Sequence, residues 1–138
     1  MPALKAIAKL APVVLTIHNP LNADNVDQNV FIADRDYTVE SVAESHAVAG
    51  NDAGAVTLDV KKAEGTTAIA SGTTVLASTF DLKGTANTVV TKNRPNGGVV
   101  TTPVATLNAG DRLGIDVTGT ITTLAGVCVT IVLRPTGA

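Results

Sequence analysis

Asn108-Ala109-Gly110-Asp111 forms a turn that leads into Arg112-Leu113-Gly114-Ile115-Asp116-Val117, and Gly126-Val127-Cys128-Val129-Thr130-Ile131-Val132-Leu133 follows after a Thr/Gly-rich segment. The first run alternates, because Leu113, Ile115 and Val117 share one face while Arg112 and Asp116 share the other. This alternation predicts a half-buried antiparallel strand. The second run is nearly all apolar, which predicts a strand covered on both faces.

Further short strands separated by turn residues fill the rest of the chain. Val56, Leu58 and Val60 alternate with polar residues and are expected to face inward. We also expect an extended segment at 37–46, a short buried strand at 29–33, and strands at 13–17, 85–91, 99–102 and 105–107. About eight strands with turns at intervals of roughly 8–15 residues predict an all-β fold, an antiparallel β-sandwich. Residues 63–84 are expected to form a long crossover between the sheets, which favours a jelly-roll or Greek-key topology.

The chain divides into an N-terminal arm, residues 1–12, and a single β-sandwich domain, residues 13–138. Pro2 and Pro12 bracket a segment too short to form a stable isolated helix. Its apolar and basic side chains suit contact with a neighbouring subunit. We therefore predict an attachment arm made by Leu4, Lys5, Ile7, Lys9 and Leu10.

Composition predicts a thin hydrophobic core. Apolar residues make up 45% of the chain but aromatic residues only 2%, so the core must be built from Val, Ala, Leu and Ile. Burying a Val side chain contributes roughly 1.5–3 kcal/mol, and an Ala much less. We expect a monomer of modest stability that gains from burial in an oligomer.

Charge and hydropathy exclude two classes of partner. The net charge is −2 and no Lys/Arg cluster is present, which argues against nucleic acid as a partner. No apolar run approaches the roughly 20 residues that span a bilayer, so no membrane is expected. The N-terminus lacks the hydrophobic core of a signal peptide, which predicts synthesis in a cytoplasm-like space. Cys128 is expected to act as a small buried hydrophobe.

Catalytic and metal-binding patterns are incomplete. Ser45, His46 and Asp52 have the residue types of a catalytic triad. Neighbours on a strand point to opposite faces, so Ser45 and His46 could not pair directly, and we predict that the protein is not an enzyme. Both histidines, His18 and His46, are expected at the surface. A calcium site could draw on clustered carboxylates, yet the spacing of an Asp-x-Asp-x-Asp-Gly loop is missing, and we expect no metal and no cofactor. The carboxylates concerned are Asp24, Asp27, Asp34 and Asp36.

Threonine is abundant and points to a binding surface. The chain has twenty threonines, which suit the half-wet surface of a sheet. They indicate either ordinary strand surface or a weakly polar face that docks on another protein, where charge is depleted. The notable positions are Thr118, Thr120, Thr122, Thr123 and Thr130.

Four segments together resemble the small β-rich structural proteins of tailed bacteriophages, in particular head decoration (cement) proteins of jelly-roll type. The segments are Phe31–Val39, Asn51–Leu58, Phe80–Thr88 and Leu107–Leu113. The likeness covers roughly residues 13–134. It implies a homotrimer that stands on the outer surface of the virion capsid and contacts the major capsid protein.

The functional prediction is therefore a non-enzymatic virion structural protein that binds the outer capsid surface and stabilises the shell. Three weak contacts on one rigid trimer would act together at high effective concentration. The alternative is a receptor- or carbohydrate-binding module of a phage spike, fibre or tail. Sugar sites usually need an aromatic platform or a metal, and the chain has one Tyr and no Trp.

Overall fold

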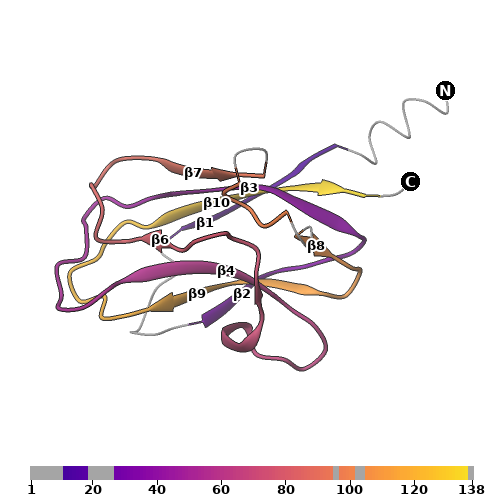
Figure 1. The fold of residues 1–138 in the computed structure, drawn as a ribbon, viewed down its shortest axis with the longest axis horizontal. Helices are drawn as coiled ribbons and strands as arrows, with labels where there is room; N and C mark the ends of the chain where they lie inside the picture. Colours follow the sequence, from indigo (N-terminus) through magenta and orange to yellow (C-terminus); the bar gives the residue numbers. More distant parts are fainter. Residues whose placement is uncertain (1–10, 19–26, 95–96, 102–104, 137–138) are drawn as a thin grey trace.

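The computed structural model describes residues 11–18, 27–94, 97–101 and 105–136, which form a sandwich of two antiparallel sheets (Figure 1). Among these residues the regular elements are strands and one turn of 3₁₀-helix, η1. The strands are β1 (Val13–His18), β2 (Asp27–Ile32), β3 (Tyr37–Ser45), β4 (Thr57–Ala63), β5 (Thr73–Thr74), β6 (Phe80–Asp81), β7 (Val90–Asn93), β8 (Thr106–Leu107), β9 (Arg112–Thr118) and β10 (Cys128–Pro135), and η1 spans Ile69–Ser71.

The strand order is that of a jelly roll. The first sheet has the order β1-β10-β3-β7 with β8 also paired to β3, and the second has the order β2-β9-β4-β5 with β6 also paired to β4. The partners are nested, since β1 pairs with β10, β2 with β9, β3 with β7 and β4 with β5. The predicted all-β sandwich is thus confirmed. The ten strands exceed the expected eight through two-residue strands such as β6 and β8.

The two sheets enclose a core of aliphatic side chains. Val56, Leu58 and Val60 are fully buried, as their alternation predicts, and Leu113, Ile115 and Val117 lie beside them on the inner face of the neighbouring strand β9. A bulge in β3 opposite Val132 and Leu133 shifts the alternation by one residue. Because of this bulge, Val39 and Val42 are both buried although they are three positions apart.

The turn before β9 forms as predicted. Gly110 adopts a φ of 91°, a left-handed conformation that favours glycine. The backbone N–H of Asp111 donates to the carbonyl of Asn108 (2.9 Å), and the Asp111 carboxylate accepts from the Asn108 N–H (2.8 Å). This closed turn fixes the register of the following strand.

Two predictions about burial are wrong. In β10, Val129, Ile131 and Leu133 are buried, but Cys128, Thr130 and Val132 lie half-exposed on the outer face of the first sheet. Residues 29–33 do not form a buried strand either, because β2 is the edge of its sheet and its residues are exposed or half-exposed. An apolar run predicts that at least one face of a strand is buried. The order of the strands in the sheet, and whether the strand lies at the edge, decide whether the other face is covered as well.

The crossover prediction is also wrong in its position. Residues 63–81 stay with the second sheet, because β5 and β6 both pair with β4. The chain passes to the first sheet only after Asp81, on its way to β7. The strand expected at 85–91 is correspondingly shorter and begins at Val90.

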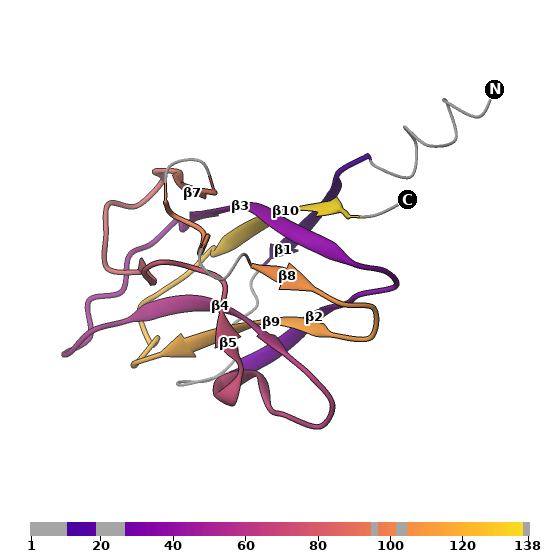
Figure 2. The same ribbon diagram turned by 45° about the vertical axis from the view of Figure 1, so that its right-hand side comes forward.

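The outer face of the second sheet is covered by the loop that contains η1, seen below β4, β9 and β2 in Figure 2. Ile69 is buried there, and a Cβ placed on Gly114 would come within 2.6 Å of its side chain. Glycine at position 114 therefore lets the loop lie flat on β9. In the part of the chain that is described, no helix has the length and apolar character needed to cross a bilayer.

Candidate binding surface

The outer face of the first sheet is free of charged side chains over most of its area. The antiparallel registers place Thr16 beside Thr130, Thr130 beside Ala43, and Ala43 beside Thr91. Residues directly opposite each other share a face, so the rows before and after this one are fixed as well. We call this surface the uncharged face; its residues are Val14, Thr16, His18, Ser41, Ala43, Ser45, Thr91, Asn93, Cys128, Thr130 and Val132.

A small charged cluster borders the uncharged face at one end. Glu40 forms ion pairs with two arginines, with its Oε1 3.3 Å from Arg134 Nε and 3.5 Å from Arg94 Nη2. The Nε of Arg94 is buried and has no hydrogen-bond partner among the described residues. Two positive groups around one carboxylate leave this border with a net positive charge.

The outer face of the second sheet has the opposite character. Asp59 and Asp116 lie side by side in the register, and Lys61 Nζ binds Asp116 Oδ2 at 2.7 Å. Arg112 Nη1 donates to Asn29 Oδ1 at 3.0 Å and Nη2 donates to the carbonyl of Gly65 at 3.1 Å. This face is charged and partly covered by its own loop, which is the usual state of a sheet surface in contact with water.

The difference between the two faces identifies the uncharged face as the better candidate for protein contact. Desolvating a charged group costs several kcal/mol unless it finds a partner, whereas burying a methyl group is favourable and burying an unpaired hydroxyl costs less than burying a charge. Depletion of charge marks the centre of protein interfaces. The outer face of the first sheet is therefore less costly to desolvate than the outer face of the second.

Only part of the threonine prediction matches this surface. Thr130 lies on the uncharged face, together with Thr16 and Thr91, which the sequence did not single out. Thr118 ends β9 in the second sheet, and Thr123 binds the Asp52 carboxylate from a loop. Thr120 and Thr122 also lie between β9 and β10, away from the face.

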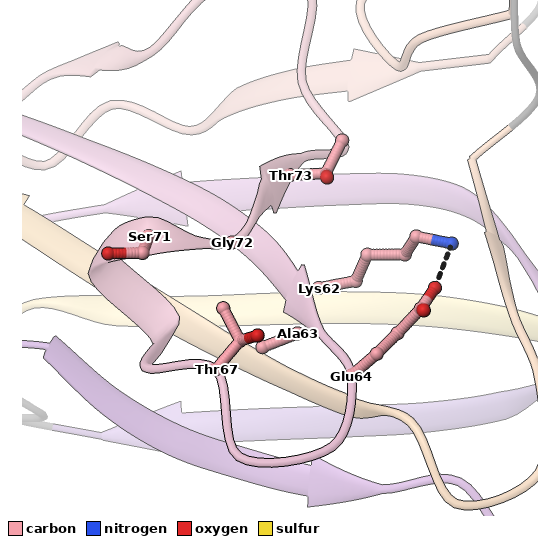
Figure 3. A pocket seen from close by; sticks show the side chains of 7 residues that line it. All are labelled: Lys62, Ala63, Glu64, Thr67, Ser71, Gly72 and Thr73. Carbon is pink, nitrogen blue, oxygen red and sulfur yellow. Dashed lines mark ion pairs between the residues drawn. The ribbon is translucent and has the colours of Figure 1, made fainter.

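A hollow of about 250 Å³ opens where β4 meets the loop of η1 (Figure 3). Lys62 Nζ lies 3.6 Å from Glu64 Oε1 and also donates to the carbonyl of Thr106 at 3.0 Å. The Ser71 hydroxyl points away from this ion pair in Figure 3. None of the seven residues that line the hollow is aromatic, so it offers no stacking platform for a sugar ring.

The structure does not bring together the three residues of the hypothetical catalytic triad. Ser45 lies on the uncharged face, His46 points into the sandwich, and Asp52 accepts from Thr123. His18 is exposed as predicted, but the surface placement of His46 is wrong because only 3% of it is exposed. Its Nδ1 lies 2.8 Å from Glu44 Oε1 and its Nε2 lies 3.1 Å from the carbonyl oxygen of Gly84.

The candidate calcium ligands are held apart by separate donors. Asp24 lies outside the described residues. Asp34 accepts from Arg35 and Tyr37, Asp36 from the N–H of Ala109, and Asp27 from the N–H of Ala70. Within the described ranges no three His, Cys, Asp or Glu side chains are grouped so as to hold a metal ion.

Chelation is therefore expected to leave the protein unchanged. In a thermal melt with and without EDTA, the melting temperature should agree within experimental error, because the described carboxylates already have protein donors. A drop of more than about 10 °C would contradict this, since it would reflect several kcal/mol of linked metal binding.

Cys128 does not take the buried position that the sequence predicts. It lies half-exposed on the uncharged face, directly opposite His18 on β1 and Ser45 on β3. His18 and Cys128 are thus a cross-strand pair between the first and the last described strand. No motif in the sequence could reveal it, because the two residues are far apart in the chain.

The residues of the predicted attachment arm, Leu4, Lys5, Ile7, Lys9 and Leu10, lie outside the described residues. The structure describes the chain from Ala11, immediately before β1. β1 is the edge strand of the first sheet and contributes Val14, Thr16 and His18 to the uncharged face.

Comparison with known proteins assigns the fold. No protein-family model matches the sequence, and no curated protein matches it either. A chain of the capsid of Ralstonia phage GP4 has a similar structure, with a TM-score of 0.64 and 14% sequence identity over 94% of this chain and 85% of that chain. A chain of the acid-stable capsid of Helicobacter pylori bacteriophage KHP30 has a TM-score of 0.56 and 15% identity, over 93% and 90% of the two chains. The protein shares its fold with these phage capsid chains.

Proposed function

We propose that this protein is a non-enzymatic structural protein of a phage virion, a decoration (cement) protein that binds the outer capsid surface and stabilises the shell. The observation that carries the proposal is the uncharged face, presented by a jelly roll similar to chains of two phage capsids. A domain of this kind contributes a rigid surface and no chemistry.

The uncharged face would be the surface that meets the shell. Its centre, around Thr130, consists of small and β-branched side chains that can pack closely against another flat protein surface. The Arg94–Glu40–Arg134 border would fix the orientation by meeting an acidic group of the major capsid protein. Apolar contact would give affinity, and the charged border would give register.

We expect the protein to act as a homotrimer. Among the described residues the buried core has only two aromatic side chains, Tyr37 and Phe80, so further burial between copies would stabilise it. Three faces on one particle would also bind at high effective concentration, so that individually weak contacts hold firmly. Multi-angle light scattering of the purified protein should give about three times the chain mass of 13.9 kDa. A monomer at micromolar concentration, with no trimer on the shell, would contradict this expectation.

The arm, residues 1–12, would add a second contact with the shell. Leu4, Ile7 and Leu10 supply aliphatic surface, and Lys5 and Lys9 supply charge for acidic groups on a neighbouring subunit. Deletion of residues 2–11 should leave the melting temperature of the free protein nearly unchanged and weaken its binding to capsids. Unfolding of the free deletion variant would instead make the arm part of the sandwich, and unchanged binding would make it a passive tail.

Co-sedimentation tests the proposal as a whole. Purified protein is mixed with capsids that lack it and separated on a density gradient. Saturable migration with the capsids, together with a higher melting temperature of the shell, is the expected result. Absence of binding to capsids, with binding to host cells or to surface polysaccharide, would favour a receptor- or carbohydrate-binding module instead.

A further inference from the structure

His46 and Glu44 form a buried polar pair at the end of β3, with side chains only 3% and 1% exposed. The pair lies on the inner face of the first sheet, in line with Val42. Buried polar groups of this kind need complete hydrogen bonding, because each unsatisfied group is costly. The pair therefore constrains which protonation state the fold can hold.

Both ring nitrogens of His46 face oxygen acceptors. Nε2 lies 3.1 Å from the carbonyl oxygen of Gly84, which can only accept, so Nε2 must carry a proton. Nδ1 lies 2.8 Å from Glu44 Oε1, and that contact needs a second proton, on the ring or on the carboxyl group. A neutral imidazole beside a carboxylate supplies only one. The two observed contacts of His46 therefore need two protons, one more than a neutral imidazole beside a carboxylate provides.

The Gly84 contact ties the end of β3 to the segment that connects the two sheets. Gly84 lies in the crossover, residues 82–89, which leads from β6 in the second sheet to β7 in the first. Two backbone bonds support the same connection: Asn87 N–H donates to the carbonyl of His46 at 2.7 Å, and Gly50 N–H donates to the carbonyl of Leu82 at 3.0 Å. The crossover ends at Val89, which is 68% exposed and adjoins the edge strand β7.

We propose that His46 is a proton-operated latch that fastens the crossover 82–89 to the end of β3. With two protons shared between His46 and Glu44, both hydrogen bonds are made and β7 is held on its sheet. Loss of one proton leaves two acceptors facing each other in a buried site, and the crossover separates from β3. The edge of the uncharged face at β7 is then less ordered.

The charged groups around His46 favour its protonated form. Burial by itself lowers the pKa of His46, but hydrogen bonds to Glu44 and Gly84 and the negative charges of Glu44 and Asp81 outweigh it, so its pKa is raised above the ordinary value. The ammonium group of Lys83 is engaged by the carbonyls of Asp52 and Gly54. Two other elements packed against the pair present uncharged residues opposite Glu44: β10 presents Val129, and β7 presents Val90.

The sign of the pH effect follows from the raised pKa. The latch stabilises the fold fully below the unfolded-state pKa of about 6.5, and this stabilisation is lost as the pH rises through the higher folded-state pKa. The latch is therefore closed in mildly acidic solution and opens as the pH rises through the folded-state pKa of His46.

Thermal melts of the full chain from about pH 6 to about pH 9 test the latch. The wild-type melting temperature should fall by a few degrees across this range. His46→Gln should melt lower than wild type at the acidic end and show a much flatter pH dependence. His18→Gln, which removes the exposed histidine, is the matched control and should keep the wild-type slope. Equal slopes for wild type and His46→Gln would overturn the proposal.

Nuclear magnetic resonance gives a second readout that does not depend on the folding of His46→Gln. The ring signals of the two histidines are assigned with His18→Gln, and His46 should titrate above about pH 6.5. After correction for intrinsic exchange, the Asn87 and Gly50 amides should exchange at least about tenfold faster once His46 has lost its proton. A lower titration midpoint, or exchange that does not respond to it, would overturn the latch.

Discussion

Val129→Asp is expected to abolish folding. Val129 has no exposed surface and lies between Ile17 of β1 and the buried Glu44 of β3 in the register. An aspartate there would bury an uncompensated carboxylate beside another acidic group, at a cost of several kcal/mol. Single domains are stable by only about 5–15 kcal/mol, so most of the stability would be lost.

The neighbouring residue provides the matched control. Thr130→Asp introduces the same side chain one position along β10, on the half-exposed outer face. The yield of soluble protein, far-ultraviolet circular dichroism and a thermal melt compare the two variants. Native-like Val129→Asp protein would show that β10 is not oriented as described, and so would equal damage from Thr130→Asp.

Thr130→Asp is expected to lose binding to capsids although it folds. Thr130 lies at the centre of the uncharged face, with Thr16 on one side and Ala43 on the other. A carboxylate buried there without a partner should weaken each contact by at least about tenfold. Because three copies would bind together, the loss for a trimer should be far larger.

Thr118→Asp is the control for the second sheet. Thr118 is exposed at the end of β9, and the outer face of that sheet already carries Asp59 and Asp116. Co-sedimentation with capsids should show wild-type binding for this variant. Wild-type binding by Thr130→Asp, or an equal loss of binding in both variants, would show that the uncharged face is not the surface that binds capsids.

Alternation in the sequence was sufficient to predict much of the fold. Leu113, Ile115 and Val117 on one strand and Val56, Leu58 and Val60 on another are buried as their period of two requires. The turn at 108–111 was also predictable, because Gly and Asp there have specific conformational roles. Local residue chemistry determines these features.

The errors concern properties that depend on sheet order. Val132 and Cys128 were expected to be buried from the apolar run around them, yet their sheet is covered on one side only within the described residues. His46 was expected at the surface because its sequence neighbours are polar, but the bulge in β3 sets which residues of the strand point inward. Neither the sheet order nor the bulge has a local sequence signal.

The candidate surface could be predicted only in part. The abundance of threonine and the low charge suggested a weakly polar docking face, but its members lie on four strands distant in sequence, from Thr16 to Thr130. Only the registers of β1, β10, β3 and β7 bring them together. Thr118 and Thr123 look equivalent to Thr130 in the sequence and lie elsewhere in the fold.

Electron cryomicroscopy of the parent particle is the most direct test of the proposed decoration role. The account predicts density for this jelly roll on the outside of the shell, with the uncharged face of β1, β10 and β3 directed toward the major capsid protein. Density at a spike, fibre or tail, or density on the shell with the charged face of β9 and β4 directed inward, would contradict it.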